Sequence, residues 1–195
     1  MLVFRKVFNF SFLLCIIPLN YAKLYQFFFD NEHLFDKCSH IEGSNGIYDM
    51  VDITELNLEF SEGNINCSGN VTIIWDVQPE DRIEFHGEIF KYGRGSWQPT
   101  VYNVLSKDFC EAQYDKNLYW YQLWAKNIPT EEQICVNHKG LTYHHTPFSI
   151  NSVFDVPVNA EGRHKIEITF TAYENGIVER PNSICFQIVG ELIKV

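Results

Sequence analysis

Strict alternation of apolar and polar residues is the feature that most limits how this chain folds. The alternation is clearest near the carboxyl end, where Ile166, Ile168, Phe170 and Ala172 are interleaved with Lys165, Glu167, Thr169 and Thr171. A period of two places successive side chains on opposite faces of a β-strand, so one face of this strand is apolar. An apolar face must be covered by another layer, which favours an all-β fold of packed antiparallel sheets.

Shorter segments with the same rhythm predict the remaining strands. They lie at 53–60, 71–77, 83–89, 97–104, 148–150, 153–156 and 184–193, and an aromatic lead-in at 25–35 is a further candidate. Turn residues separate these segments at 63–69, 93–95 and 175–176. The sequence therefore predicts one domain over residues 23–195, an antiparallel β-sandwich of seven to eight strands.

One segment breaks the alternation. Between residues 106 and 128 the apolar positions recur at helical spacing until a proline ends the run, as shown by Leu118, Tyr121, Ala125, Ile128 and Pro129. Tyr119, Trp120 and Trp124 add further aromatic surface, and one short helix cannot turn all of it toward one core. We therefore expect this helical insertion to meet a ligand, a partner, a membrane interface or another part of the domain.

The amino terminus predicts a secretory signal peptide over residues 1–22. Arg5 and Lys6 precede an apolar run at 7–17, Pro18 ends it, and Ala22 offers a small residue for cleavage. The run is too short to span a bilayer. Loss of the two basic residues changes the formal net charge from −10 to −12. This acidity disfavours nucleic acid as a partner, and we expect a secreted, extracellular protein.

The cysteines of the secreted chain predict disulfides. Cys15 belongs to the signal, which leaves Cys38, Cys67, Cys110, Cys135 and Cys185. Oxidising compartments favour disulfide bonds, and no C-x-x-C spacing supports a zinc site. An odd count leaves one thiol over, and spacing alone does not decide the connectivity.

The sequence offers little support for catalysis. No Gly-x-Ser-x-Gly nucleophile motif occurs, and the adjacent His144 and His145 would point to opposite faces of a strand. We therefore expect no enzyme activity, no metal and no cofactor. The sequons beginning at Asn66 and Asn70 are candidate glycosylation sites in the turn-rich segment.

Several motifs resemble one family of secreted lipid carriers. Phe109-Cys110, Ile128-Pro129, Cys135 before Gly140, and the closing segment 185–192 are similar to the ganglioside activators. The runs 97–100 and 159–163 resemble more closely an insect branch of that superfamily, which includes chemosensory proteins of the A and B groups. The resemblance implies an immunoglobulin-like β-cup with a helical lid. It also implies Cys38–Cys185 and Cys110–Cys135 pairs, with Cys67 as the candidate free thiol.

What the resemblance implies for function is binding without catalysis. A lipid or other small hydrophobic molecule, such as a pheromone or cuticular hydrocarbon, would occupy an apolar cup, with a membrane receptor as a further partner. The expected ligand contacts are Trp75, Phe85, Phe154 and Phe170 inside the cup, with Trp120 and Trp124 at its mouth. On alternation alone, Trp75 and Phe170 are first expected in an ordinary core. The alternative is an extracellular protein-interaction module with a filled core and an aromatic docking helix.

Overall fold

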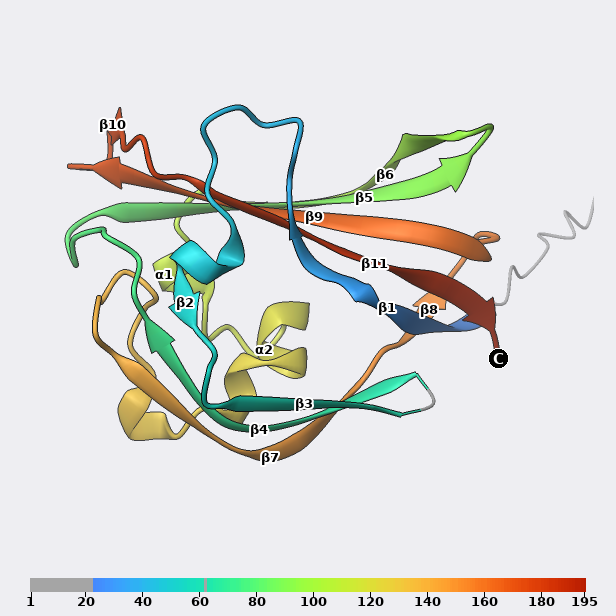
Figure 1. The fold of residues 1–195 in the computed structure, drawn as a ribbon, viewed down its shortest axis with the longest axis horizontal. Helices are drawn as coiled ribbons and strands as arrows, with labels where there is room; N and C mark the ends of the chain where they lie inside the picture. The colour runs from blue at the N-terminus through green and yellow to red at the C-terminus, as the bar shows by residue number, and fades with distance from the viewer. Residues whose placement is uncertain (1–22, 62) are drawn as a thin grey trace, which may run out of the picture.

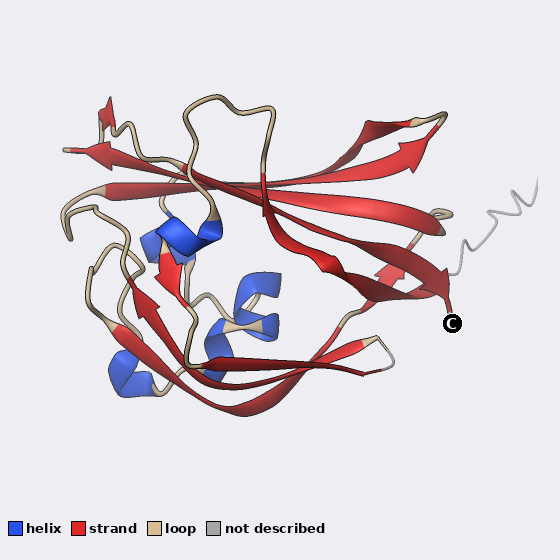
Figure 2. Cartoon of the chain, in the orientation of Figure 1, coloured by secondary structure: helices blue, strands red, loops and turns tan. Residues whose placement is uncertain are grey.

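The computed structural model describes residues 23–61 and 63–195. The segment 1–22, which holds the predicted signal peptide, lies outside the described residues. Strands dominate the described part and form two antiparallel sheets, one above the other (Figure 1). The helices in this part of the chain are short (Figure 2). An all-β architecture is therefore confirmed.

The larger sheet contains seven of the described strands. Their order is β6-β5-β9-β11-β1-β8, and β10 pairs with β9. The bounds are β1 Lys23–Lys37, β5 Arg82–Gly93, β6 Ser96–Ser106, β8 Val153–Val156, β9 Gly162–Glu174, β10 Val178–Glu179 and β11 Ile184–Lys194. The alternation predicted for β9 is present, because Phe170 and Ala172 are buried on the face turned toward the smaller sheet.

The smaller sheet contains four described strands. Strand β4 pairs with β2, β3 and β7. The bounds are β2 Val51–Asp52, β3 Leu56–Ser61, β4 Asn64–Ile73 and β7 Thr142–Asn151. Ile65, Cys67, Val71 and Ile73 alternate along β4 and are all buried, so this face of the sheet looks toward the larger sheet.

The two sheets are joined where β7 continues into β8. Ser152 lies between these strands and is buried. Its hydroxyl donates to the carbonyl of Phe27 at 2.9 Å, and its own carbonyl accepts the Phe27 N–H at 2.9 Å. The hydroxyl also reaches the carbonyl of Gly63 at 3.4 Å, beside the β3–β4 turn. One residue thus connects both sheets, which together curl into a half-barrel (Figure 1).

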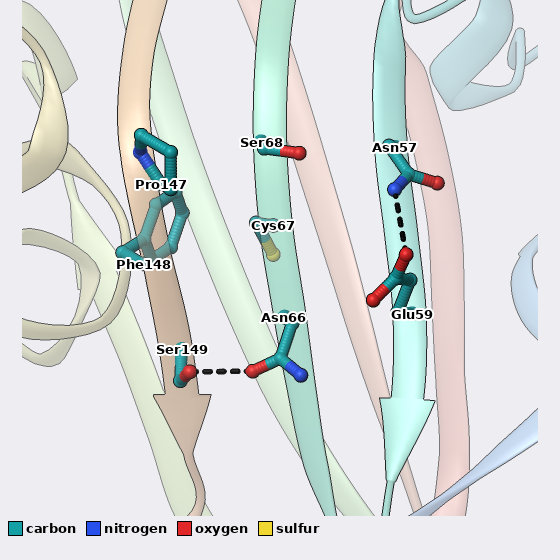
Figure 3. A pocket seen from close by; sticks show the side chains of 8 residues that line it. All are labelled: Asn57, Glu59, Asn66, Cys67, Ser68, Pro147, Phe148 and Ser149. Atoms are coloured by element: carbon teal, nitrogen blue, oxygen red, sulfur yellow. Dashed lines mark hydrogen bonds between the residues drawn. The ribbon is translucent and has the colours of Figure 1, made fainter.

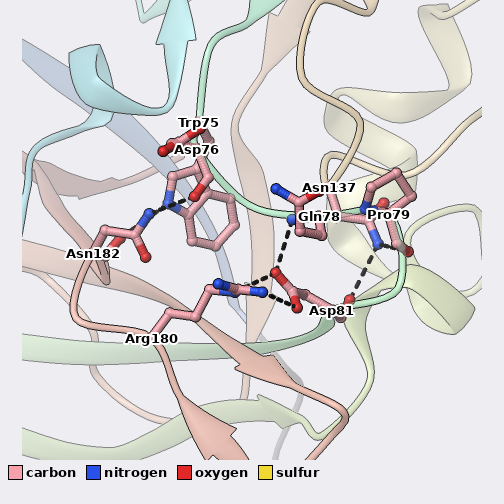
Figure 4. Close-up of polar contacts among 8 residues, drawn as sticks. All are labelled: Trp75, Asp76, Gln78, Pro79, Asp81, Asn137, Arg180 and Asn182. Carbon is pink, nitrogen blue, oxygen red and sulfur yellow. Dashed lines mark hydrogen bonds and ion pairs between the residues drawn. The ribbon is translucent and has the colours of Figure 1, made fainter.

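A buried core fills the space between the sheets near β2 and the first helix. Its largest members come from both sheets and from the segment between β6 and β7, and they include Ile73, Trp75, Ile83, Phe109, Tyr143, Phe170 and Ile184. The Trp75 indole N–H donates to the carbonyl of Asn182 at 2.9 Å, and the Asn182 amide donates to the carbonyl of Asp76 at 2.8 Å (Figure 4). These bonds fix the loop that follows β4 against the loop that precedes β11.

Both disulfides implied by the resemblance are present. Cys38–Cys185 joins the end of β1 to β11, with 5.5 Å between the Cα atoms. Cys110–Cys135 closes the segment between β6 and β7, with 5.2 Å between the Cα atoms. Cys67 is the free cysteine among the described residues, and burial raises the pKa of its thiol to about 11. Such a thiol stays protonated and unreactive at neutral pH.

The insertion predicted for 106–128 is helical, but it is not one continuous helix. The segment holds two short helices, α1 (Phe109–Ala112) and α2 (Tyr119–Leu123), and the 3₁₀ turns Ala125–Asn127 and Thr130–Glu132 follow. Asp115 explains the first break, because its carboxylate accepts from the N–H of Asn117 at 2.9 Å and forms a turn. The immunoglobulin-like sandwich with a helical lid is therefore not confirmed at this level of detail.

Other predicted boundaries also differ. The turn expected at 63–69 belongs almost entirely to β4, because β3 and β7 supply hydrogen-bonding partners on both sides. Trp75 lies beyond the end of β4, where the N–H groups of Ile74 and Trp75 both bond to the carbonyl of Met50. The described residues form eleven strands rather than seven to eight, since Val51–Asp52 and Val178–Glu179 pair as short additional strands.

Candidate binding site between the sheets

The segment that links β6 to β7 is fixed in place by local bonds. Asp108 caps α1, because its carboxylate accepts from the N–H groups of Cys110 and Glu111 at 3.1 and 3.3 Å. The Cys110–Cys135 disulfide then ties the start of the segment to its end. The carbonyl of Ile134, next to this disulfide, accepts the hydroxyls of two tyrosines, Tyr114 at 2.8 Å and Tyr143 at 2.6 Å.

This anchoring brings α2 into contact with the larger sheet through Trp120. The Trp120 ring lies 6.4 Å from Phe85 of β5 and 6.2 Å from Phe170 of β9, measured between ring centroids. Phe109 of α1 completes the cluster at 5.4 Å from Trp120. Three of the predicted ligand contacts, Phe85, Trp120 and Phe170, therefore lie together in one aromatic cluster.

Trp124, at the end of α2, contacts the smaller sheet. Its ring lies 4.6 Å from His145 and 5.7 Å from Phe148, both on β7. Trp120 and Trp124 are one helical turn apart, and the Trp124 N–H donates to the carbonyl of Trp120 at 3.0 Å. The two tryptophans thus connect the sheets through one turn of helix. They pack against the domain itself, which is one of the alternatives left open by the sequence.

Beyond this aromatic cluster, the inner faces of the two sheets are only partly buried. Ile89, Ile166 and Ile188 are register partners across β5, β9 and β11, on the same face as the buried Phe170. All three isoleucines are only half-buried. Leu34 of β1 pairs with Ile188 and is half-buried as well. Solvent therefore reaches a row of aliphatic side chains on the inward face of the larger sheet.

The smaller sheet has matching rows. Ile65 and Cys67 of the central strand β4 are buried, whereas their register partners on β3 and β7 are half-buried: Leu58, Phe60, Phe148 and Ile150. These side chains share the face that looks toward the larger sheet. Apolar surface on both sheets is thus left partly open beside α2.

Two buried polar groups beside this surface have no hydrogen-bond partner. His145 is 6 % exposed, and neither ring nitrogen has a partner in good hydrogen-bonding geometry. The indole N–H of Trp120 is also buried without an acceptor. Burial lowers the pKa of His145 to about 4, although the nearby Asn127 backbone and Glu132 oppose this shift. The imidazole is therefore neutral at neutral pH, with one donor and one acceptor nitrogen.

The other predicted ligand contacts lie elsewhere. Trp75 is 1 % exposed and belongs to the filled part of the core, as does Phe170, also at 1 %. Phe154 lies on β8, and its ring is 6.0 Å from the exposed Tyr119. The structure thus brings Phe85, Trp120 and Phe170 together and puts Trp124 one turn away. Trp75 is buried in the same core, whereas Phe154 lies apart, in contact with Tyr119.

Sequence reasoning did not select the half-buried isoleucines or His145 as site residues. Alternation from Phe170 places Ile168 and Ile166 on the inward face, but it carries no information on how far the core extends. Alternation from Tyr143 likewise puts His145 inward. As predicted for the histidine pair, His144 and His145 point to opposite faces, and His144 is exposed beside Glu132.

A polar concavity of about 380 Å³ lies on the opposite face of the smaller sheet. Its lining includes Asn57, Glu59, Asn66 and Ser149, whose polar side chains alternate with the inward Cys67 and Phe148 (Figure 3). Asn57 donates to Glu59 at 3.1 Å, and Ser149 donates to Asn66 at 2.5 Å. These side chains satisfy one another in a shallow, solvated setting.

The same face carries both predicted glycosylation sites. Asn66 is exposed, and its side-chain oxygen accepts the hydrogen bond from Ser149. Asn70 is half-buried, and its amide nitrogen, the atom that would carry a glycan, donates to Glu55 at 2.8 Å. Accessibility therefore favours Asn66. Occupancy of either site stays a prediction.

A scan of protein-family models finds no match to the chain, and a search of curated proteins finds no significant relative. In the described residues, no cluster of three or more histidine, cysteine or acidic side chains could hold a metal ion. Over the same part of the chain, no helix has the length and apolar character needed to cross a bilayer.

Proposed function

We propose that this chain is a secreted, non-catalytic carrier of a lipid or another small hydrophobic molecule, held between the two sheets beside α2. The observation that supports the proposal best is the row of Ile89, Ile166 and Ile188, which faces inward and is nevertheless only half-buried. A sandwich whose inner face is filled by its own side chains would bury such a row.

The energetics of this surface favour an apolar ligand. Each methylene of a ligand that leaves water contributes about 0.8 kcal/mol. The partly exposed rows of apolar side chains on both sheets would also lose water when the alkyl chain of a ligand lies between them. The strands beneath are held by the Cys38–Cys185 disulfide, so binding does not have to order them.

The resemblance to ganglioside activators supports the same proposal. Its two implied disulfides are present, and disulfides fit an oxidising extracellular environment. On this basis we also propose membership of the insect branch, and a pheromone or cuticular hydrocarbon as ligand. A membrane receptor would be the partner that takes up the loaded carrier.

The rival proposal, a protein-interaction module with an aromatic docking helix, has weaker support. The rings of Trp120 and Trp124 pack inward on both sheets, so they offer little surface to a partner. Tyr119, at 68 % exposure, is the aromatic residue of α2 that faces solvent most. A docking helix would be expected to present its tryptophans outward.

Native mass spectrometry and displacement of a fluorescent naphthylamine dye from the secreted protein test the carrier proposal. Ile166→Phe should fill the space beside the row of isoleucines. It should weaken binding of the hydrophobic probe at least tenfold and leave secretion unchanged. The matched control is Ile177→Phe, at a turn position that is 82 % exposed, and it should bind like the wild type. A wild-type protein without copurified lipid that no hydrophobic compound occupies would refute the proposal.

A further inference from the structure

The ligand's head group can be inferred from the unbonded polar atoms beside the proposed site. His145 lies on the inward face of β7, between the rings of Trp124 at 4.6 Å and Phe148 at 5.7 Å. It is 6 % exposed, and neither ring nitrogen has a partner in good hydrogen-bonding geometry, although the Asn127 backbone lies close enough to the ring to raise its pKa. A buried polar group without a hydrogen bond is costly and is seldom retained without a reason.

A second buried donor without a partner lies on α2, one helical turn before the Trp124 that contacts His145. The buried indole N–H of Trp120 belongs to the turn of α2 that also carries Trp124. Its ring packs on Phe85 and Phe170, so the indole lies against the aromatic end of the proposed site. Helix α2 therefore places the unpaired Trp120 N–H, and through Trp124 an edge-on contact to the His145 ring of β7, next to partly open apolar surface.

The charges around these groups restrict what they would bind. Glu132 lies beside His144, on the outward face of β7, and the nearest lysine along this segment, Lys126, is exposed. The charged groups that act on His145 are Glu132 and His144, with no lysine or arginine among them, so a carboxylate would enter this layer without a lysine or arginine as counter-charge. A hydroxyl avoids this cost, because it donates to one imidazole nitrogen and accepts from an N–H group.

Building on the carrier function proposed above, we infer that the ligand is an uncharged amphiphile whose hydroxyl head group hydrogen-bonds to His145, with the Trp120 indole as a second donor in the same layer. The alkyl chain then extends along Ile89, Ile166 and Ile188. The site thereby selects a fatty alcohol over a hydrocarbon and over a fatty acid of equal length.

Competition for a bound fluorescent naphthylamine dye tests this inference on the full, delipidated secreted protein. Dodecane, dodecanol and dodecanoate are the competitors, at neutral pH. Dodecanol should displace the dye at roughly tenfold lower concentration than dodecane, the value expected for one good hydrogen bond. His145→Phe should remove this advantage and leave displacement by dodecane unchanged, and Trp120→Phe should reduce it.

The neighbouring histidine provides the matched control. His144→Phe makes the same substitution one residue away on the exposed face, and it should keep the preference for dodecanol. If His145→Phe does not fold, nitrogen NMR of the wild type replaces it, since dodecanol and not dodecane should shift the His145 ring signals. Equal displacement by dodecane and dodecanol, or stronger displacement by dodecanoate, would overturn the inference about the head group. The carrier proposal would remain. Failure of all three competitors would remove the carrier proposal itself.

Discussion

Arg180 binds the buried carboxylate of Asp81 through two hydrogen bonds, of 2.5 and 2.9 Å (Figure 4). The carboxylate also accepts the N–H of Gln78 at 2.8 Å. Burial would raise the pKa of Asp81, but the bonds from Arg180 and Gln78 outweigh it and hold the pKa below its ordinary value. The pair fixes the loop after β4, and thereby Trp75, against the loop before β11.

Arg180→Ala should therefore lower the thermal midpoint of unfolding by several degrees, because it leaves the Asp81 carboxylate buried with one remaining partner. Calorimetry at neutral pH measures the change. The control is Lys139→Ala, which breaks an exposed pair with Asp76 and should have little effect. Equal losses in the two variants would contradict the structural role given to Arg180.

Acid should weaken the same pair. A carboxylate with a lowered folded-state pKa stabilises the fold above its unfolded pKa, and this contribution is lost as the pH falls through the folded value. For Asp81 this range lies below about pH 4. Urea unfolding of the wild type and of Asp81→Asn should differ at neutral pH and converge in acid. A difference that is constant with pH would count against the proposed linkage.

The two disulfides should contribute unequally. Cys38–Cys185 spans 147 residues and Cys110–Cys135 spans 25, so the first restricts the unfolded chain more. In the chain-entropy model the losses on removal are about 5 and about 3.5 kcal/mol. Paired serine substitutions and chemical unfolding under non-reducing conditions compare them. A larger loss from the shorter loop would show that native packing around Cys110, rather than chain entropy, dominates.

The sequence predicted most of the larger sheet because its strands follow a strict period of two. The turn predicted at 63–69 is wrong. Asparagine and glycine disfavour a strand on their own, but pairing with β3 and β7 overrides that preference. The alternation in β9 also does not indicate what covers its polar face. Lys165 and Glu167 on that face are only 9 % and 4 % exposed, because the rings of Phe90 and Trp97 and the side chain of His40 lie over them.

The candidate site was predicted less completely than the fold. The excess of aromatic residues around Trp120 indicated a contact, but the turn at Asp115 divides the segment and directs the tryptophans inward. The burial of the His145 ring nitrogens depends on how Trp124 packs over the imidazole. That contact joins residues far apart in the chain, and local sequence pattern does not encode it.

Gly190 should be intolerant of any side chain. A Cβ at this position would lie 2.3 Å from the carbonyl oxygen of Phe28 and 2.5 Å from the ring of Phe27. Gly190→Ala should therefore destabilise the protein by about 2–3 kcal/mol. Gly93→Ala is the control, because no atom lies within 4 Å of the place that its methyl group would occupy, and the effect should stay within about 0.5 kcal/mol. Chemical unfolding of both variants decides whether Phe27 packs as closely on β11 as described.

The buried His145 should make the stability of the empty protein depend on pH. Burial lowers its folded-state pKa from 6.5 to about 4, and His144 adds to this effect, while the Asn127 backbone and Glu132 oppose it. The unfolded chain therefore binds a proton that the folded chain does not, so stability falls as the pH decreases from about 6.5 to about 4.

His145→Phe should remove this part of the pH dependence and leave the steeper loss from carboxylates at lower pH. His144→Phe, at the exposed neighbouring position, should keep it. Unfolding midpoints measured across this pH range in wild type and both variants give the comparison. A wild-type profile that is flat between these values would mean that His145 binds its proton equally in the folded and the unfolded chain, which would contradict the burial of its ring in the structure.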